Sequence, residues 1–446
     1  MIRKVAGAKA VLSHSHPIHK ARLQGQSDQC GPREDLMRFS KLAGFLLGTA
    51  LLVSGTAFGR ELVINSDTSD PAPRKAFELV IADFKKANPD IEVKFNVYDH
   101  ESYKKSIRNW LTSAAPDVVF WYVGNRQAQF VGPGLLEDVS SVFTPEVKAS
   151  LGPVATDLAS VDGKQYGVPY TYYHWGIYYR KDLFEKAGVT KAPEKWDDFL
   201  AACDKIKASG VEPIAIGSKD LWPTGGWFDY LDMRKNGYGF HMKLMGGKVS
   251  YTDEHVKAVF ASWKQLLDKG CFVKNHASTT WQESQSLLFQ GKASMMLIGN
   301  FITPNFPKEI APNMAFMPFP VIDAAMGSAE DAPMDSVHIP AKAKNKDDAK
   351  KFLAFMAQAS VQEGINKALM QLPVNQQSAV ADDRFLKDGR TLLTSAKNIA
   401  QFYDRDSVEE LATVGMKAFQ EFMVNPDRAD KVIDDIERAR KRIYPE

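Results

Sequence analysis

Cysteine is scarce in this sequence, and neither sign of charge dominates it. Only three cysteines occur among 446 residues, which excludes a disulfide framework as the main source of stability. Lysine and arginine number 56 against 54 acidic residues, and this net charge of +2 does not suggest a nucleic-acid-binding protein. With 44% hydrophobic and 25% charged residues, the composition is that of a folded protein of two or three domains.

An apolar run near the N-terminus is too short to cross a membrane. It covers residues 42–53, follows the basic stretch 37–41 and precedes the small residues Ala57 and Gly59, an order typical of a secretory signal peptide. Because a signal peptide normally stands first, we interpret residues 1–36 as a non-native N-terminal extension and 37–59 as the signal peptide, cleaved near Gly59. No cysteine stands at the cleavage site, so we expect a periplasmic protein without a lipid anchor.

Removal of these 59 residues reverses the sign of the net charge. Eight basic and three acidic residues precede Arg60, which leaves 48 basic and 51 acidic residues and a net charge of −3. The weak argument for an anionic partner therefore disappears. Cys203 and Cys271 remain, and we expect both to be small buried hydrophobic side chains, although the sequence leaves open whether they pair.

Strand and helix patterns alternate over the first 60 residues of the mature chain. Strands are predicted at 61–65, 91–97 and 117–122, and amphipathic helices at 77–84 and 103–111. This order predicts an open α/β sheet. Because ligands bind beyond the carboxyl ends of such strands, we expect Asp67 and Trp121 at a ligand-binding rim.

The rest of the chain contains no recognisable catalytic motif. A Pro- and Gly-containing segment at 222–227 predicts a loop that carries two tryptophans, and helices are predicted at 350–357, 408–424 and 429–443. The sequence has no phosphate-binding loop, dinucleotide fingerprint, nucleophile elbow or metal-ligand spacing. We therefore expect no cofactor, no metal and no enzymatic activity, while paired carboxylates for glycoside chemistry remain open.

A series of short motifs then occurs in a fixed order. They are DGKQYGVPY at 162–170, IYYRKDLFEKAG at 177–188, WDDF at 196–199, FQGKASMM at 289–296, MPFP at 317–320 and NKDDA at 345–349. Each motif alone is weak evidence for any family. Because the whole set occurs in this order, residues 60–446 resemble the family 1 extracellular solute-binding proteins, the maltose-binding-protein-like receptors of bacterial ABC sugar importers.

The resemblance implies a fold and a function. The fold would be α/β, with two lobes joined by a hinge and a cleft between them, and with chain crossings near Tyr170, Met295 and Asp335. The first lobe would comprise 60–170 plus 296–335, and the second 171–295 plus 336–446. The protein would be a monomeric periplasmic receptor that captures a mono- or oligosaccharide by hinge closure and delivers it to the membrane permease of an ABC importer.

A sugar site needs two kinds of side chain. Aromatic rings cover the apolar face of a pyranose, and polar groups bind its hydroxyls. From the strand ends and the resemblance together, we expect the ligand-binding residues to be Asp67, Trp121, Arg126, Tyr172, Tyr173, His174, Trp175, Trp222, Trp227, Trp281, Asn300, Phe301 and Asp335.

Other ligands and activities stay open. Arg74 and Arg126 could pair with the carboxylate of an acidic sugar, although ordinary surface pairing would also explain them. A non-sugar solute, or a secreted glycoside hydrolase or lyase with a similar cleft, is a further alternative. The sequence does not specify the sugar, its linkage or its chain length.

Overall fold

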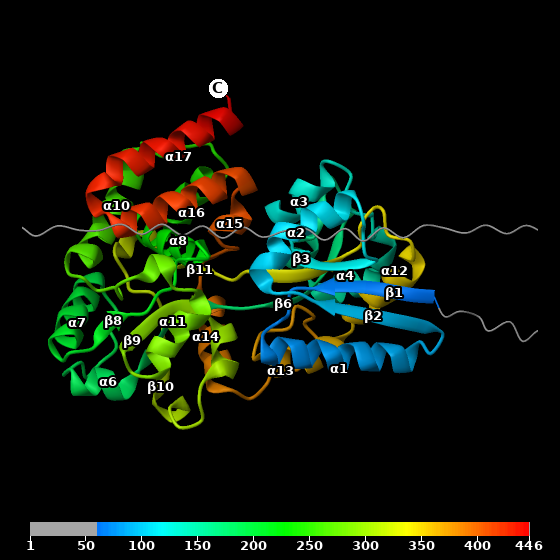
Figure 1. Ribbon diagram of the computed structural model, residues 1–446, viewed down its shortest axis with the longest axis horizontal. Coiled ribbons are helices and arrows are strands. Elements are labelled where there is room, and N and C mark those ends of the chain that lie inside the picture. The colour runs from blue at the N-terminus through cyan, green and yellow to red at the C-terminus, as the bar shows by residue number, and fades with distance from the viewer. Residues whose placement is uncertain (1–59, 446) are drawn as a thin grey trace, which may run out of the picture. The chain divides into compact units, whose positions relative to one another are not determined.

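The computed structural model describes residues 60–445, so the predicted extension at 1–36 and the signal peptide at 37–59 lie outside the described residues. The described chain has a sheet and a large hydrophobic core in each of two lobes (Figure 1). This confirms the predicted two-lobed α/β fold. In this part of the chain, no helix combines the length and the apolar character needed to cross a bilayer.

The first lobe contains a five-stranded mixed sheet. Its strands, in spatial order, are β2 (Ile91–Val97), β1 (Arg60–Ser66), β3 (Val118–Tyr122), β12 (Met334–His338) and β6 (Gly167–Tyr172). Strand β1 runs parallel to both β2 and β3, whereas β12 runs antiparallel to β3 and β6. The carboxyl ends of β1, β2 and β3 therefore lie at one edge of the sheet.

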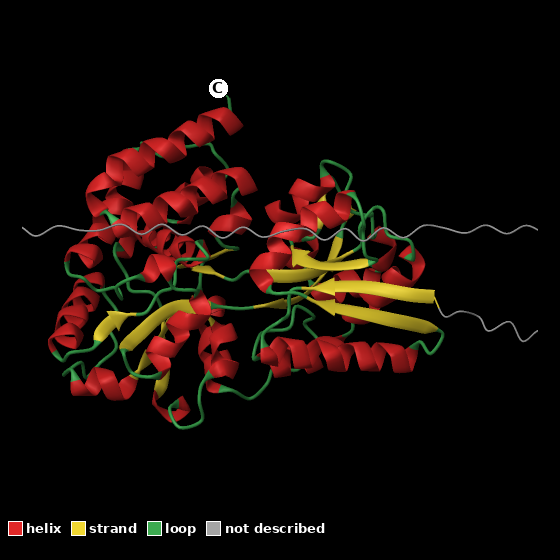
Figure 2. Cartoon of the chain, in the orientation of Figure 1, coloured by secondary structure: helices red, strands yellow, loops and turns green. Residues whose placement is uncertain are grey.

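Helices flank this sheet (Figure 2). They are α1 (Pro71–Ala87), α2 (His100–Thr112), α3 (Asn125–Val131), α4 (Pro145–Leu151), α5 (Pro153–Leu158), α12 (Lys346–Met356) and α13 (Ala359–Leu369), with a small ribbon of β4 (Ser160–Val161) and β5 (Lys164–Gln165). The predicted strands and helices of residues 61–122 are confirmed. Helix α2 begins where the Asp99 carboxylate accepts a hydrogen bond from the Ser102 N–H at 2.9 Å.

The second lobe has a four-stranded sheet. Its strands, in spatial order, are β10 (Met314–Met317), β7 (Trp175–Arg180), β9 (Ala293–Gly299) and β8 (Glu212–Ile214). Around it are α6 (Lys181–Lys186), α7 (Trp196–Ala208), α8 (Trp222–Asn236), α9 (Tyr238–Met245), α10 (Glu254–Asp268), α11 (Trp281–Phe289), α14 (Arg384–Ser395), α15 (Tyr403–Asp406), α16 (Glu409–Val424) and α17 (Ala429–Ile443). A short parallel pair joins β11 (Ala329–Asp331) to β13 (Asn398–Ala400).

Strand pairing corrects the predicted lobe boundaries. Strand β9 pairs with β7 up to Gly299, and β10 pairs with the other edge of β7, so residues 296–317 belong to the second lobe rather than the first. Helices α12 and α13 bury Phe352, Leu353 and Ile365 in the first core, so that segment does not belong to the second lobe. These partners are distant in sequence, and local patterns do not report them. The chain crosses between the lobes near 172–174, 331–333 and 375–384.

The predicted loop at 222–227 is wrong, because these residues form the first turns of α8. A Cβ added at Gly226 would lie 2.9 Å from the Trp175 ring and 3.2 Å from Phe402. The glycines therefore serve close packing inside a helix rather than a turn. Both cysteines are buried, as expected, and the structure shows that they do not form a disulfide with each other. A hydrogen bond with Cys271 together with burial raises the pKa of Cys203.

Candidate ligand-binding site

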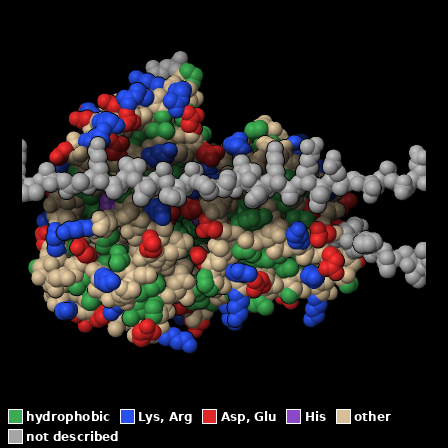
Figure 3. All heavy atoms as spheres, in the orientation of Figure 1, with side chains coloured by type: hydrophobic (Ala, Val, Ile, Leu, Met, Phe, Trp, Pro, Cys, Tyr) green, Lys and Arg blue, Asp and Glu red, His purple; other side chains and the backbone are tan. Residues whose placement is uncertain are grey.

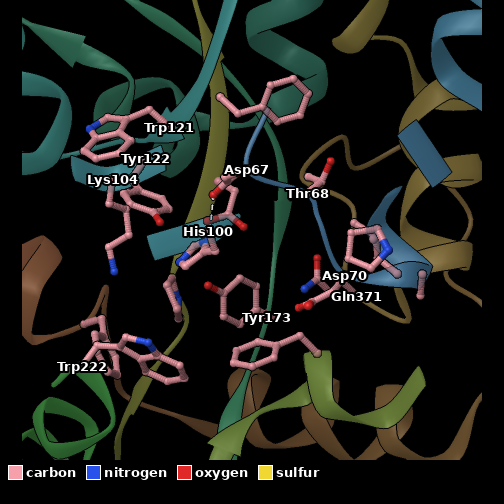
Figure 4. A pocket seen from close by; sticks show the side chains of 18 of the residues that line it. Asp67, Thr68, Asp70, His100, Lys104, Trp121, Tyr122, Tyr173, Trp222 and Gln371 are labelled. Carbon is pink, nitrogen blue, oxygen red and sulfur yellow. Dashed lines mark ion pairs between the residues drawn. The ribbon is translucent and has the colours of Figure 1, made fainter. Parts of the chain in front are cut away.

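A pocket of about 170 Å³ is lined by residues of both lobes. The first lobe contributes Asp67, Thr68, Asp70, His100, Lys104, Trp121 and Tyr122, and the second contributes Trp175, Trp222, Trp281, Phe301, Phe402, Asp404 and Arg405. Tyr173, Asp335 and Gln371 line it from the segments near the hinge. Figure 4 shows Lys104 and Trp222 on one side of Tyr173, and Asp70 and Gln371 on the other.

Four rings of the second lobe, Trp175, Trp222, Trp281 and Phe301, form what we call the aromatic wall. The ring centroids of Trp175 and Trp222 are 5.9 Å apart, those of Trp222 and Trp281 5.7 Å, and those of Trp281 and Phe301 5.5 Å. All three pairs meet edge to face, an arrangement that is favourable for aromatic pairs and holds each ring in place. The wall is therefore a fixed apolar surface inside the pocket.

Helix N-termini position two rings of this wall. Trp222 is the first residue of α8, and Trp281 is the first residue of α11. Helix α11 starts with a capping box, in which Thr280 and Glu283 each bind the backbone N–H of the other. The backbone N–H of Trp281 also donates to a carboxylate oxygen of Asp220 at 3.1 Å.

On the opposite side, Asp67, His100 and Lys104 form what we call the polar wall. Asp67 follows β1, and His100 and Lys104 lie one turn apart on α2. His100 Nδ1 is 2.9 Å from Asp67 Oδ2, while its Nε2 is 4.0 Å from Glu101. Burial opposes protonation of His100, but the bond to Asp67 and the charges of Asp67 and Glu101 outweigh it, so the pKa of His100 is raised.

Arg405 occupies the space between the hinge and the first lobe. Its Nη1 is 2.9 Å from Asp335 Oδ1, its Nη2 donates to the Tyr173 hydroxyl at 2.9 Å, and its guanidinium lies 3.8 Å from the Tyr122 ring centroid. Burial raises the pKa values of Tyr122, Tyr173 and Asp335. Both tyrosines therefore remain phenols, whose hydroxyls can hydrogen-bond to a ligand.

Carboxylates outnumber cationic groups around the pocket. Asp67, Asp70, Asp335 and Asp404 face His100, Lys104 and Arg405. Each basic side chain lies within 3.4 Å of a carboxylate, which is Asp67 for His100, Glu101 for Lys104 and Asp335 for Arg405. Burial raises the pKa of Asp70, which forms no ion pair with any residue between 60 and 445. Over the same residues, no group of His, Cys, Asp and Glu is arranged to hold a metal ion.

Residues 68–363, well over half of the chain, match the model of the bacterial extracellular solute-binding protein family. The chain belongs to this family. The match begins at the carboxyl end of β1 and extends into α13, so it includes most residues of the pocket.

Relatives of this solute-binding protein extend over most of its length. It is 26% identical over 397 residues to a binding protein of Brucella abortus, which covers 88% of this chain and 96% of the relative. It is 25% identical over 307 residues to an ABC transporter extracellular-binding protein of Pyrococcus horikoshii, covering 67% and 68% of the two chains. Among solved structures, the bacterial solute receptor AcbH matches with a TM-score of 0.80 and 29% identity, covering 86% of this chain and 99% of AcbH.

The structure brings eight of the predicted site residues of this solute-binding protein together in the pocket. They are Asp67, Trp121, Tyr173, Trp175, Trp222, Trp281, Phe301 and Asp335. Their contact with a ligand stays a prediction. Asp67 and Trp121 come from strand ends, and Tyr173 and Trp175 lie at or just after the first crossing, as the sequence interpretation expected. Trp222 and Trp281 are instead the first residues of helices, which the sequence interpretation did not predict.

Five predicted residues do not line the pocket. Trp227 packs in the core between Phe272 and Phe319, with ring centroids 5.0 and 5.6 Å away, and Tyr172 lines a separate groove near the hinge. His174 is fully buried 3.0 Å from the Tyr178 hydroxyl, and burial lowers its pKa to about 3.

The other two of these residues, Asn300 and Arg126, have structural partners. The Asn300 amide donates to the backbone carbonyl of Met370, and the Arg126 guanidinium stacks 4.9 Å from the Trp121 ring. Arg74 pairs with Glu78 at 3.0 Å on an exposed helix face. Neither arginine proposed for an acidic sugar therefore lines the pocket.

Sequence reasoning missed several pocket residues, above all His100, Lys104, Asp404 and Arg405. His100 and Lys104 could have been predicted from the sequence, because they follow β2, whose carboxyl end lies beside that of β1. Asp404 and Arg405 lie on the four-residue helix α15, which is too short to give a periodic signal.

Proposed function

We propose that this protein binds a neutral carbohydrate in the pocket between its lobes and delivers it to the membrane permease of an ABC importer. One observation carries the proposal: the aromatic wall and the polar wall line the same pocket. Rings suit the C–H face of a pyranose, and Asp67, Asp335 and the tyrosine hydroxyls suit its hydroxyl groups. The reported preference of AcbH for β-D-galactopyranose supports a hexose ligand.

The charges in the pocket favour a neutral ligand over an acidic one. A ligand carboxylate would need a basic partner, yet His100, Lys104 and Arg405 are each already close to a protein carboxylate. Asp70 and Asp404 would add repulsion against a second anion. A neutral sugar can exchange hydrogen bonds with these groups without adding charge.

Delivery to a permease implies that the protein acts outside the cytoplasmic membrane. The likeness to an ABC transporter extracellular-binding protein supports this role. We propose a periplasmic receptor without enzymatic activity, released by cleavage near Gly59. Mass spectrometry of the exported protein should place its first residue between Phe58 and Glu61. Recovery of residues 1–36 on the exported protein would contradict this.

A thermal-shift screen tests the ligand class. The panel contains D-galactose, D-glucose, lactose and raffinose as neutral probes, and D-galacturonate as the acidic probe. A sugar present at 100 times its Kd should raise the free energy of unfolding by about 2.7 kcal/mol. We expect stabilisation by at least one neutral sugar and none by galacturonate. Stabilisation by galacturonate alone would contradict the proposal, as would hydrolysis of lactose or raffinose by the purified protein.

A further inference from the structure

Helix α15 is fixed firmly in the second lobe. The Tyr403 N–H donates to Asp229 at 2.6 Å, and the hydroxyls of Tyr403 and Tyr251 are 3.0 Å apart. The Tyr403 ring packs 4.9 Å from Phe419, and the adjacent Phe402 ring lies 4.7 Å from Trp175 of the aromatic wall. The backbone of α15 should therefore move with the second lobe.

The same four-residue helix contacts the first lobe at two points. The Arg405 guanidinium stacks on Tyr122 at the end of β3 and pairs with Asp335 on β12. One residue later, the backbone carbonyl of Asp406 accepts a hydrogen bond from the side-chain amide of Asn125 at 2.6 Å. Arg405 is buried, so these interactions are little screened by water.

A second interlobe contact is different in kind. Arg108 on α2 pairs with Glu409 on α16 at 3.3 Å, with side chains 54% and 45% exposed. An exposed ion pair contributes little, because water and salt screen it. The contacts of α15 are thus the stronger link between the lobes at this end of the pocket.

We infer that α15 is a latch, in which Arg405 and the Asp406 carbonyl hold the first lobe and set the fraction of molecules in the closed, binding-competent arrangement. This inference rests on the proposed function, because it concerns closure around that pocket. Rotation of the lobes away from each other must separate Arg405 from Tyr122 and Asn125 from Asp406. The latch therefore biases the open–closed equilibrium before any ligand binds.

The latch has a measurable consequence for affinity. When only a fraction of the free protein is competent to bind, the apparent Kd rises by the inverse of that fraction. Arg405→Lys keeps the charge but loses the planar donor fork, and we expect it to weaken binding by about 5- to 150-fold. Asn125→Ala removes a hydrogen bond outside the pocket, so we expect a loss of about 2- to 10-fold.

The experiment compares four proteins: wild type, Arg405→Lys, Asn125→Ala and the control Arg108→Ala. Small-angle X-ray scattering measures the radius of gyration of each protein without ligand, and calorimetry measures the Kd for the sugar that stabilises wild type most. We expect a larger radius of gyration and weaker binding in both latch variants, with no change in Arg108→Ala. Asn125 is exposed, so its variant keeps the test decisive even if Arg405→Lys does not fold.

The outcomes separate a latch from a simple ligand contact. If binding weakens in Arg405→Lys alone and scattering matches wild type in both latch variants, Arg405 is only a ligand contact and the inference fails. A change in Arg108→Ala as large as in Asn125→Ala would also overturn it. Scattering of the free proteins decides the latch without any sugar, whereas failure of wild type to bind any sugar counts against the proposed function.

Discussion

Three tryptophans that look alike in the sequence differ in their surroundings. Trp222 and Trp281 are 8% and 5% exposed and line the pocket, whereas Trp227 is 1% exposed and does not. Trp227 instead lies between Phe272 and Phe319 in the second core. The sequence placed all three in the cleft, because composition alone does not distinguish a ring that faces a ligand from a ring that faces the core.

Substitution by alanine should separate these roles. Trp222→Ala removes a ring of the aromatic wall, and we expect sugar binding to weaken by about 1–3 kcal/mol. Trp227→Ala leaves a cavity in the core, and we expect the free energy of unfolding to fall by about 3–5 kcal/mol, with affinity nearly unchanged. Calorimetric titration and urea unfolding of both variants measure the two quantities. The reverse pattern would show that Trp222 is a core residue and Trp227 a ligand contact.

Helix α8 illustrates how an element can contradict its local sequence. Gly225 and Gly226 lower helix propensity, yet the chain is helical there because the Trp175, Phe402 and Tyr403 side chains approach the backbone closely. Tertiary packing has overridden local preference. Gly239 on α9 is an exposed helical glycine with open space around its Cα, and so provides a matched control.

We expect the two glycines to respond oppositely to alanine. Gly226→Ala places a methyl group against Trp175 and Phe402, so it should destabilise the protein by about 1–3 kcal/mol and weaken sugar binding through the displaced ring. Gly239→Ala should stabilise it by about 0.5–1 kcal/mol through helix propensity. Thermal melting of both variants, with and without sugar, checks this. If Gly226→Ala stabilised the protein as much as Gly239→Ala, the methyl group at position 226 would not clash with Trp175 and Phe402, which would contradict the close packing of α8.

Asp331, at the end of β11, is fully buried, and neither of its carboxylate oxygens has a hydrogen-bond partner between residues 60 and 445. Burial raises its pKa to about 8; His241 opposes this shift, and Asp406 and Glu330 add to it. The folded protein therefore holds a proton on Asp331 that the unfolded chain has lost above its ordinary pKa near 4.

The sign of the resulting pH dependence follows from this proton. Because the folded state binds more protons between pH 4 and pH 8, its stability falls as pH rises through that range, by up to about 1.4 kcal/mol per pH unit from this group. Asp331→Asn removes the titration while keeping the shape of the side chain. We expect the variant to gain stability relative to wild type between pH 5 and pH 8 in urea unfolding. Parallel curves would show that Asp331 is ionised in the folded protein.

For the whole molecule, local patterns were enough to predict three strands of the first sheet but not the division into lobes. Local apolar patterns predicted β1, β2 and β3, and the strand-end rule predicted Asp67 and Trp121 at the pocket. The placement of β9 and β12 depends on pairing with strands more than 100 residues away. The spacing of apolar residues within a strand does not indicate which distant strand it pairs with, so the lobe boundaries could not be derived from the sequence pattern.

The distribution of charge over the surface is also a property of the whole molecule. Figure 3 shows acidic and basic side chains interspersed on the face in view, in keeping with the small net charge of the sequence. The pocket differs, because carboxylates outnumber basic groups there. The selectivity for neutral ligands that we propose would therefore come from the site rather than from the protein's total charge.

We propose above all that both lobes bind one neutral sugar in one pocket. Calorimetric titration of wild type, Asp67→Asn and Trp281→Ala with the best neutral sugar of the panel tests it most directly, because the two residues come from opposite lobes. We expect a single site in wild type and a loss of affinity of about 1–3 kcal/mol in each variant, with melting temperatures close to wild type. Unchanged affinity in either variant, or no binding of any neutral sugar by wild type, would contradict it.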